Sequence, residues 1–537
     1  MPSGLAVKPT ATTEVKRLMA ASLRDTFMND KTLKKIVIVG GGTAGWMAAA
    51  PMAQRLLAGK EHATEVIVIE SPEIGTIGVG EATLPTIRYY NKSLGLDGVD
   101  FVKRTQATFK VGIEFKDWGS LGHRFFHGFG DFGPAIENRS AYMHWLRLRS
   151  EGEVPPYEDW STSTVMARHN RFFPPQGETP AAANAYSYAF HFDAGLYASY
   201  LREYAVRRGA QHIEGMVVDV EVRPEDGFVS AVKLKDGRRI EGDLFIDCSG
   251  FRGLLIEGVM KAGYEDWSEM LPCNSALAVP SKRVAQPRKL TPYTMSTAKT
   301  AGWQWRIPLQ HRTGNGHVYC NHFTSDEEAA RTLIEGLDTE AIGTPRPLRF
   351  TTGRRRQSWV KNVVALGLAS GFLEPLESTS IQLIMDAVSR LLQYFPDKDF
   401  KPHLAAEFNR KMLAQYASIR DFIILHYKLT QRTDSEFWRY CAAMPIPDTL
   451  QHQIELFRTS GRVAIYDPEG FAEPSWVSIM MGLGVMPQSY DPFVDRIDQG
   501  QLRLHFARVR AAIAQTVEGM PDHGEYIAQH ARAEAMN

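Results

Sequence analysis

The chain has 537 residues, of which 44% are hydrophobic and 23% are charged, and its 61 basic side chains balance its 61 acidic ones. This length exceeds one small core, so we expect one large split domain or two to three packed domains. A neutral chain lacks the basic excess that nucleic acids and anionic membranes attract, so neither is an expected partner.

The N-terminal segment, residues 1–34, reads as an extension in which residues 13–28 could form an amphipathic helix. It lacks the continuous apolar core of a signal peptide, and no run of about 18 apolar residues predicts a membrane span. The four cysteines are far apart in the sequence and form no CxxC pair. We therefore expect reduced thiols in a cytoplasmic protein, with no disulfide and no metal site.

The first strong pattern is a β-branched run at residues 35–39 that ends in glycines and continues as a helical pattern. Strand, tight turn and helix are the context of the dinucleotide-binding GxGxxG motif. Gly40 permits the turn, Gly42 lets the backbone approach a pyrophosphate, and Gly45 lets helix and strand pack closely. N–H groups at the start of the helix would bind the phosphates. The expected cofactor contacts here are Gly40, Gly42, Thr43, Ala44 and Gly45.

Three further apolar runs, at residues 65–70, 242–250 and 363–371, predict strands that are widely separated along the chain. We expect an α/β fold with a doubly wound parallel sheet and a large insertion. Glu70 ends the second strand, where a carboxylate can accept hydrogen bonds from a ribose, and Asp247 ends the third. The segments 247–252 and 367–377 resemble those that enclose the flavin in FAD monooxygenase-like folds. That resemblance implies FAD as the cofactor and Asp247 as one of its contacts.

The rest of the chain divides into two kinds of sequence. Residues 134–184 are rich in proline, aromatic and polar residues and predict a long excursion over the site. Amphipathic patterns at residues 381–395 and 408–427 predict helices. We therefore divide the chain into the extension 1–34, an FAD-binding core 35–390 with an inserted substrate region, and a mostly helical C-terminal region 391–537 that covers the substrate site.

A motif at residues 302–308, Gly-Trp-Gln-Trp-Arg-Ile-Pro, resembles the GWxWxIP motif of the flavin-dependent tryptophan halogenases. Two tryptophans at this spacing would otherwise form one face of a half-buried strand. Residues 78–85, 245–256 and 372–379 also resemble that family, in the same order, and the resemblance extends from about Lys34 to Trp476. Four ordered matches make coincidence improbable.

The resemblance implies a Rossmann-like, monooxygenase-type fold and an enzyme that uses reduced FAD, oxygen and chloride or bromide. Hypohalous acid would pass through an internal tunnel to a lysine beside an indole or another electron-rich aromatic substrate. Lys110 aligns with that lysine and Glu377 with the family's active-site glutamate. Thr379 and Ser380 align with the halide-binding segment, although the family commonly has glycine where this chain has Ser380. Without the resemblance, Lys110 would be a surface lysine and Glu377 a carboxylate at a helix start.

The resemblance also indicates the substrate-binding residues. His127 and Phe129 match a stretch whose His and Phe sandwich the indole, and Trp476 can stack from the other side. Alone, a histidine among aromatic residues is more often a core residue. The adjacent tyrosines with which many tryptophan halogenases grip the amino acid have no counterpart near Trp476. We therefore expect free tryptophan to be a poor substrate.

Two alternatives remain: a flavin-dependent aromatic hydroxylase, and a flavin-binding homologue without turnover. The GWxWxIP motif together with Lys110 and Glu377 argues against both. Because the chain has a single GxGxxG motif, a second domain for NADH is not evident. We therefore expect a separate flavin reductase as a partner, and a homodimer is compatible with the sequence.

Overall fold

The computed structural model describes residues 31–56, 64–73, 80–175, 185–283, 290–467 and 469–534. The predicted helix at residues 13–28 lies outside these ranges. Among the described residues, no helix combines the length and the hydropathy needed to cross a membrane. All four cysteines are free thiols, and three of them are buried.

The cofactor-binding half of the fold is built on a six-stranded sheet in the order β20-β21-β12-β1-β2-β8. Every pairing in it is parallel except that of β20 with β21. The strands are β1 (Lys35–Val39), β2 (Glu65–Glu70), β8 (Gln211–Glu214), β12 (Leu244–Asp247), β20 (Trp359–Val360) and β21 (Val363–Ala365). The predicted α/β fold with a Rossmann-like parallel sheet is confirmed.

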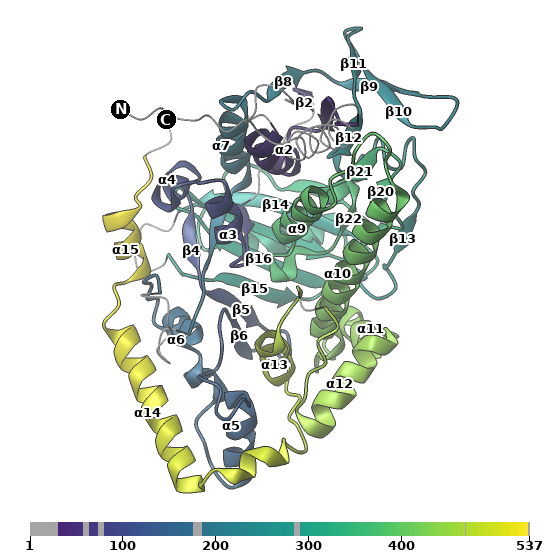
Figure 1. Ribbon diagram of the computed structural model, residues 1–537. Helices are drawn as coiled ribbons and strands as arrows, with labels where there is room; N and C mark the ends of the chain where they lie inside the picture. The colour runs from purple at the N-terminus through teal and green to yellow at the C-terminus, as the bar shows by residue number, and fades with distance from the viewer. Residues whose placement is uncertain are drawn as a thin grey trace, which may run out of the picture.

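Both faces of this sheet are covered, which explains why β1 is continuously apolar. Ile36 and Ile38 pack into the core shared with α2 (Thr43–Leu56) and α9 (Ser380–Gln393). Val37 packs on the other face, against the antiparallel sheet of β9 (Val217–Val222), β10 (Val229–Leu234) and β11 (Arg239–Glu241). Helix α7 (Ala194–Val206) lies beside α2 (Figure 1).

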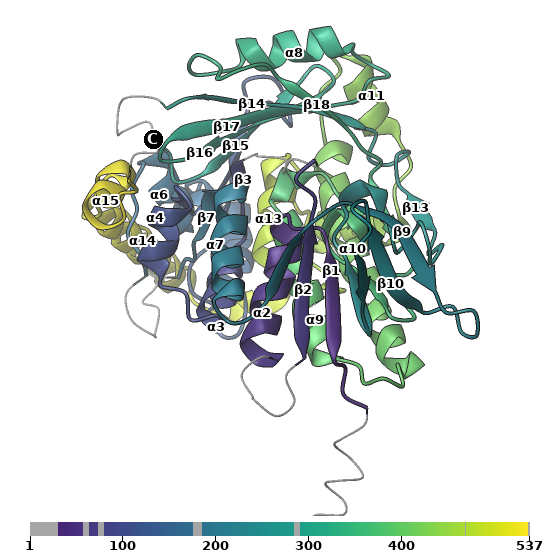
Figure 2. The ribbon, with the colours of Figure 1, turned by 90° about the horizontal axis from the view of Figure 1, so that it is seen from above.

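A second, seven-stranded sheet in the order β18-β14-β17-β16-β15-β5-β6 was missing from the sequence prediction. Helix α8 (Asp326–Glu335) covers its outer face, where Leu277 and Leu333 share a small core (Figure 2). The strands are β5 (Gly112–Lys116), β6 (Arg124–Gly128), β14 (Ser275–Lys282), β15 (Thr294–Lys299), β16 (Gly302–Pro308), β17 (Arg312–Tyr319) and β18 (Arg346–Arg349). Strand β16 is the GWxWxIP motif, and both of its tryptophans are buried, so it is not the half-buried strand of the simpler interpretation.

A three-stranded antiparallel sheet connects the two large sheets. Its central strand, β7 (Ala189–Asp193), pairs with β3 (Gly80–Ala82) on one side and with β4 (Thr108–Lys110) on the other. A further small sheet contains β13 (Tyr264–Asp266), β19 (Gly353–Arg355) and β22 (Gly371–Phe372). The connecting sheet is important for the site because it fixes Lys110 relative to the glycine-rich loop.

All regular elements described after Gln393 are helical, as predicted. They are α10 (Pro402–Lys428), α11 (Glu436–Ala443), α12 (Asp448–Ser460), α13 (Glu473–Gly482), the 3₁₀ helix at Pro492–Arg496, α14 (Gln499–Glu518) and α15 (His523–His530). The proposed boundary at 390/391 needs correction, because it falls inside α9. One continuous helix cannot be divided between two independent cores.

The region 134–184 contains helices rather than a continuous loop. They are α5 (Ala141–Ser150), a 3₁₀ turn at Tyr157–Trp160 and α6 (Thr162–Arg168), and α14 runs along the same side of the molecule (Figure 1). Trp160 donates a hydrogen bond to the carbonyl oxygen of Phe506 in α14. The inserted region and the C-terminal helix α14 therefore pack together on one side of the molecule.

Candidate active site

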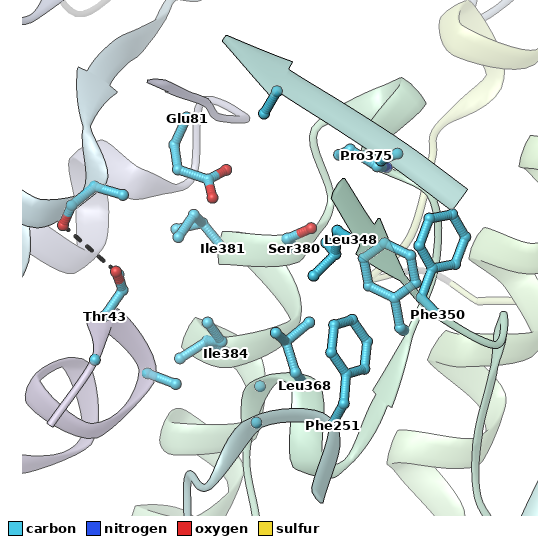
Figure 3. Close-up of a pocket in the computed structure, with 18 of the residues that line it drawn as sticks. Thr43, Glu81, Phe251, Leu348, Phe350, Leu368, Pro375, Ser380, Ile381 and Ile384 are labelled. Atoms are coloured by element: carbon cyan, nitrogen blue, oxygen red, sulfur yellow. Dashed lines mark hydrogen bonds between the residues drawn. The ribbon is translucent and has the colours of Figure 1, made fainter. Parts of the chain in front are cut away.

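A cavity of about 890 Å³ lies between the six-stranded and seven-stranded sheets. The glycine-rich loop, the segment after β12 and the start of α9 line it, together with β3 and the GWxWxIP strand. Figure 3 shows Thr43 and Glu81 on one side of the cavity, and Phe251, Phe350 and Leu368 on another. A long cavity that is mostly apolar and has a glycine loop at its edge fits a dinucleotide such as FAD.

The glycine-rich loop has the geometry of a phosphate cradle. Gly40 has φ +117°, and its N–H donates to the carbonyl oxygen of Ile69 at 2.9 Å. A Cβ on Gly45 would lie 1.9 Å from the Gly40 oxygen, so the turn itself requires glycine at that position. A Cβ on Gly42 would meet no atom within 4 Å, so that position faces open space. Thr43 and Ala44 begin α2 beside it and line the cavity.

The two carboxylates expected near the cofactor differ in position. Glu70 lines the cavity at the end of β2, with its Oε2 2.9 Å from His212 Nε2. Asp247 is fully buried and is not among the residues that line the cavity. Its carboxylate instead accepts the N–H groups of Ser249, Leu255 and Ile256 at 2.7–3.0 Å. The expected direct contact of Asp247 is corrected accordingly: it holds the loop whose residues line the cavity.

Lys110 is fully buried, which excludes the surface-lysine interpretation. Its Nζ donates to the carbonyl oxygen of Thr83 at 3.0 Å and to Ser378 Oγ at 2.8 Å, and it lies 5.0 Å from the centre of the Phe129 ring. Burial lowers the pKa of Lys110 to about 7, against the opposing effect of the Glu377 charge. A substantial fraction of Lys110 is therefore a free amine at neutral pH.

Glu377 is also fully buried and lies between two imidazoles. Its Oε2 is 2.8 Å from His127 Nδ1, and its Oε1 is 2.9 Å from His426 Nε2. Burial alone would raise the pKa of Glu377, but the two histidines outweigh burial and lower this pKa to about 2. His426 Nδ1 lies 2.8 Å from the carbonyl oxygen of Phe422, which can only accept, so a proton must lie between His426 Nε2 and Glu377.

The first turn of α9 follows directly and has free donors. Ser378 has φ +61°, and Thr379 caps the helix without a side-chain capping bond. Thr379 Oγ1 is buried and has no partner among the described residues. Ser380 lines the cavity, and N–H groups at the start of a helix attract anions. This arrangement is suited to a halide ion.

The predicted substrate residues lie in one aromatic cluster. His127 and Phe129 are 6.3 Å apart between ring centres, and Phe471 lies 6.2 Å from His127. Phe422 stacks on Phe471 at 3.9 Å and meets Trp476 edge-on at 4.9 Å. The Trp476 N–H donates to the carbonyl oxygen of Phe471, so it is not free to bind a substrate.

A polar network explains why the GWxWxIP strand and the segment 372–379 occur together. The Trp303 N–H donates to Glu374 Oε2 at 2.9 Å, and the Tyr427 hydroxyl donates to the same oxygen at 2.6 Å. Burial raises the pKa of Glu374 to about 7, although these two hydrogen bonds lower it. Trp303 therefore anchors the segment that carries Glu377.

Several residues of the site were missed from the sequence. Glu81 and Thr83 lie inside a recognised motif but were not identified, and Ser378 and His426 were expected at the halide and the substrate, not as hydrogen-bond partners of Lys110 and Glu377. The cavity is also lined by three cationic side chains that sequence reasoning did not select: Arg252, Arg312 and Arg346.

Comparison with known proteins agrees with this geometry. The tryptophan halogenase family model matches residues 35–499. The tryptophan 6-halogenase of Streptomyces albogriseolus is 34% identical, over 93% of this chain and 99% of that protein. The tryptophan 7-halogenase of Lentzea aerocolonigenes is 32% identical, over 93% of this chain and 98% of that protein.

Solved structures give the same result. A flavin-dependent halogenase from Xanthomonas campestris superposes with a TM-score of 0.89 at 43% identity, covering 94% of this chain and 100% of that one. A flavin-dependent halogenase from Brevundimonas sp. BAL3 has the same TM-score and identity, covering 93% of this chain and 100% of that one. The chain therefore belongs to the tryptophan halogenase family, whose members are flavin-dependent halogenases.

Proposed function

We propose that this protein halogenates an indole or another electron-rich aromatic compound, using reduced FAD, oxygen and chloride or bromide. The observation that carries the proposal is the position of Lys110. Its buried Nζ bonds to Ser378, which lines the cofactor cavity, and its other side faces Phe129 in the aromatic cluster. The Lys110 nitrogen thus lies between the cofactor cavity and the aromatic cluster, which are the two sites that the reaction requires.

The cavity would hold FAD with its pyrophosphate at the glycine-rich loop and its ribose near Glu70. Reduced FAD, once bound, supplies with oxygen the oxidising power that converts halide to hypohalous acid. Because the fold has one dinucleotide site among its described residues, we propose that a separate reductase supplies the reduced cofactor.

Lys110 would hold the hypohalous acid beside the substrate. In its free-amine form, two N–H groups satisfy Thr83 and Ser378, and the nitrogen lone pair remains to accept the acid's hydrogen bond or its halogen. An ordinary lysine with a pKa near 10.4 would be about 0.04% free amine at neutral pH, so burial increases the reactive form by a factor of about a thousand.

Glu377 would act on the substrate side. The two imidazoles keep it ionised at neutral pH, so its negative charge stabilises the cationic ring that forms when halogen adds. It also provides an acceptor for the proton that this ring must lose. His127 and His426 fix its orientation and can pass that proton on.

We propose simple or 3-substituted indoles as better substrates than free tryptophan. Phe129, Phe471 and Trp476 provide aromatic faces, and the Trp476 N–H is already bonded within the protein. A zwitterion would need partners for its ammonium and its carboxylate, and leaving them unpaired costs several kcal/mol.

The test is incubation with FAD, NADH, a flavin reductase and either halide against a panel of indoles, with products identified by their halogen isotope pattern. We expect halogenated products only when reductase and halide are both present. A hydroxylated product, or rapid NADH oxidation without the reductase, would favour the hydroxylase alternative instead.

A set of lysine variants tests the role of Lys110. Lys110→Ala should lose halogenation while retaining FAD binding and flavin reoxidation by oxygen, because the lysine acts after the flavin step. Lys110→Arg should also fail, since a guanidinium does not become a free amine. Lys103→Ala, which removes an exposed lysine on α4 (Gly98–Arg104), is the matched control. Substantial product from Lys110→Ala would refute the assignment.

A further inference from the structure

A second carboxyl group, that of Glu81, lies in the cofactor cavity and has no part in the function proposed above. Glu81 is the middle residue of β3, and it lines the cavity together with Ser380 and Ile381. Figure 3 shows its carboxyl group directed into the cavity, toward these two residues at the start of α9. Two residues further along the chain, the Thr83 carbonyl accepts the hydrogen bond of Lys110.

The Glu81 carboxyl group has no polar partner among the described residues. No hydrogen bond and no neighbouring charge act on it, and burial alone raises the pKa of Glu81 to about 7. Glu81 is half-buried at the cavity wall, whereas the fully buried carboxylates of this site are held by donors: Glu377 by two histidines, and Glu374 by Trp303 and Tyr427. Glu81 is thus a carboxyl group that changes charge near neutral pH while facing a cavity.

The charge of Glu81 matters because the first turn of α9 lines the same cavity and is the proposed halide site. Thr379 Oγ1 is buried there without a partner among the described residues, and no side-chain cap from Thr379 binds the first N–H groups of the helix. A halide held by these donors would share the cavity with Glu81. Two negative charges in a poorly solvated space repel strongly, whereas a neutral carboxylic acid repels no anion and can donate its O–H to one.

We propose that Glu81 controls halide binding through its protonation. In its neutral form it admits halide to the first turn of α9, and in its ionised form it excludes halide. This inference rests on the proposed function, because it requires that a halide binds in this cavity. Its consequence is that halide affinity falls as the pH rises through neutrality.

Other ionisable groups pack around β3 and must be separated from Glu81. Arginines remain charged throughout the relevant pH range, and burial lowers the pKa of His191 and His317, the latter to about 4. Burial would raise the pKa of Asp193, but hydrogen bonds from His311 and Arg312 lower it below its usual range. Burial raises the pKa of Asp386. The charged groups of the cavity and of β7, β16, β17 and α9 are Glu70, Asp193, Arg252, Arg306, Arg312, Arg346, Asp386 and Arg390.

Two other groups near the site also have a pKa of about 7: Lys110 and Glu374. Lys110 loses positive charge as the pH rises, which would weaken halide binding in the same direction. The experiment therefore compares Lys110→Gln with Lys110→Gln/Glu81→Gln, and so removes the lysine from both arms.

The measurement is bromide titration of the FAD-loaded, oxidised protein, followed by the flavin absorbance, with ionic strength held by a non-halide salt. If bromide binds only when Glu81 is neutral, its apparent Kd in Lys110→Gln rises about tenfold between about pH 6 and about pH 8. In the double variant the change should be less than about twofold. A tenfold change that survives in the double variant would overturn the proposal for Glu81. Absence of bromide binding at every pH, in wild type as well, would instead overturn the proposed halide site.

Infrared spectroscopy gives an independent measurement in which Lys110 remains in place. Infrared difference spectra should show a protonated-carboxyl band that disappears near neutral pH and is reduced in Glu81→Gln. Because coupling is reciprocal, saturating bromide should shift the midpoint of this band upward by about one pH unit or more. A midpoint that bromide leaves unchanged would refute the link between Glu81 and the halide.

Discussion

Replacing Lys110 with methionine should change the pH dependence of stability. Lys110 is fully buried, and burial lowers its pKa to about 7 in the folded protein, whereas an unfolded lysine keeps its proton up to about pH 10.4. The difference corresponds to about 5 kcal/mol of unfavourable free energy when the folded protein must hold the charge, at 1.36 kcal/mol per pH unit. A buried lysine that costs this much is typical of a functional site rather than a structural one.

The direction follows from proton uptake. Above about pH 7 the folded protein has lost the Lys110 proton while the unfolded chain retains it, so unfolding binds a proton and a rise in pH favours the folded state. Between about pH 7 and about pH 9, wild type should gain about 2.3 kcal/mol relative to Lys110→Met. Methionine also leaves Thr83 and Ser378 without a donor, but that cost of about 1–3 kcal/mol per group does not depend on pH.

The assay is urea denaturation of both proteins across this pH range, with Lys103→Met as the control for an exposed lysine. The control should show no pH-dependent difference from wild type, because the Lys103 side chain is exposed to solvent in the folded protein as well as in the unfolded chain. If the difference between wild type and Lys110→Met is the same at pH 6 and pH 9, Lys110 is not a buried, depressed amine, and the free-amine mechanism loses its basis.

Three further predictions concern the cofactor loop, the anchoring network and the substrate. Gly45→Ala should lose both FAD binding and thermal stability, because its Cβ would lie 1.9 Å from the Gly40 oxygen, whereas Gly42→Ala should weaken FAD binding about tenfold or more without lowering Tm. Thermal scans measure Tm, and equal losses of Tm in the two glycine variants would contradict this prediction. Trp303→Phe removes a donor from buried Glu374 and should reduce the unfolding free energy by about 1–3 kcal/mol, measured in urea; a change within about 0.5 kcal/mol would exclude an anchoring role. Indole should equal or exceed tryptophan in kcat/KM at saturating reduced flavin, and a preference for tryptophan above about tenfold would reveal a zwitterion site.

The parts of the fold that could be predicted from sequence are those that local patterns determine. Strand β1 and the glycine turn are encoded within residues 35–45, and their geometry is as expected. The predictions of the family and of an FADH2-dependent halogenase are confirmed by the comparisons. Within the seven-stranded sheet, β15, β16 and β17 pair as neighbours in sequence, but no local pattern indicates that the β5–β6 hairpin joins them through the distant pairing of β5 with β15.

The site shows the same limit at the level of single contacts. The motifs selected Lys110 and Glu377, but the partners that set their charge come from distant segments: Ser378 is 268 residues from Lys110, and His127 is 250 residues from Glu377. Asp247 illustrates the opposite error. A carboxylate at a strand end was expected to contact the cofactor, but its oxygens accept hydrogen bonds from the N–H groups of the loop that follows.

The last helix has a consequence for the order in which this site can form. The Phe109 N–H, one residue before the catalytic lysine candidate, donates to His523 Nε2 in α15, and His523 Nδ1 lies 2.7 Å from the Leu290 carbonyl oxygen. Strand β4 can pair with β7 soon after both are synthesised, but the outward N–H of Phe109 lacks its side-chain acceptor until about 414 more residues have been synthesised. Contacts this far apart in sequence slow folding, because the intervening chain must be closed before they contribute. During synthesis on the ribosome, the glycine turn can form early, but the strand of Lys110 is completed only after α15 has emerged.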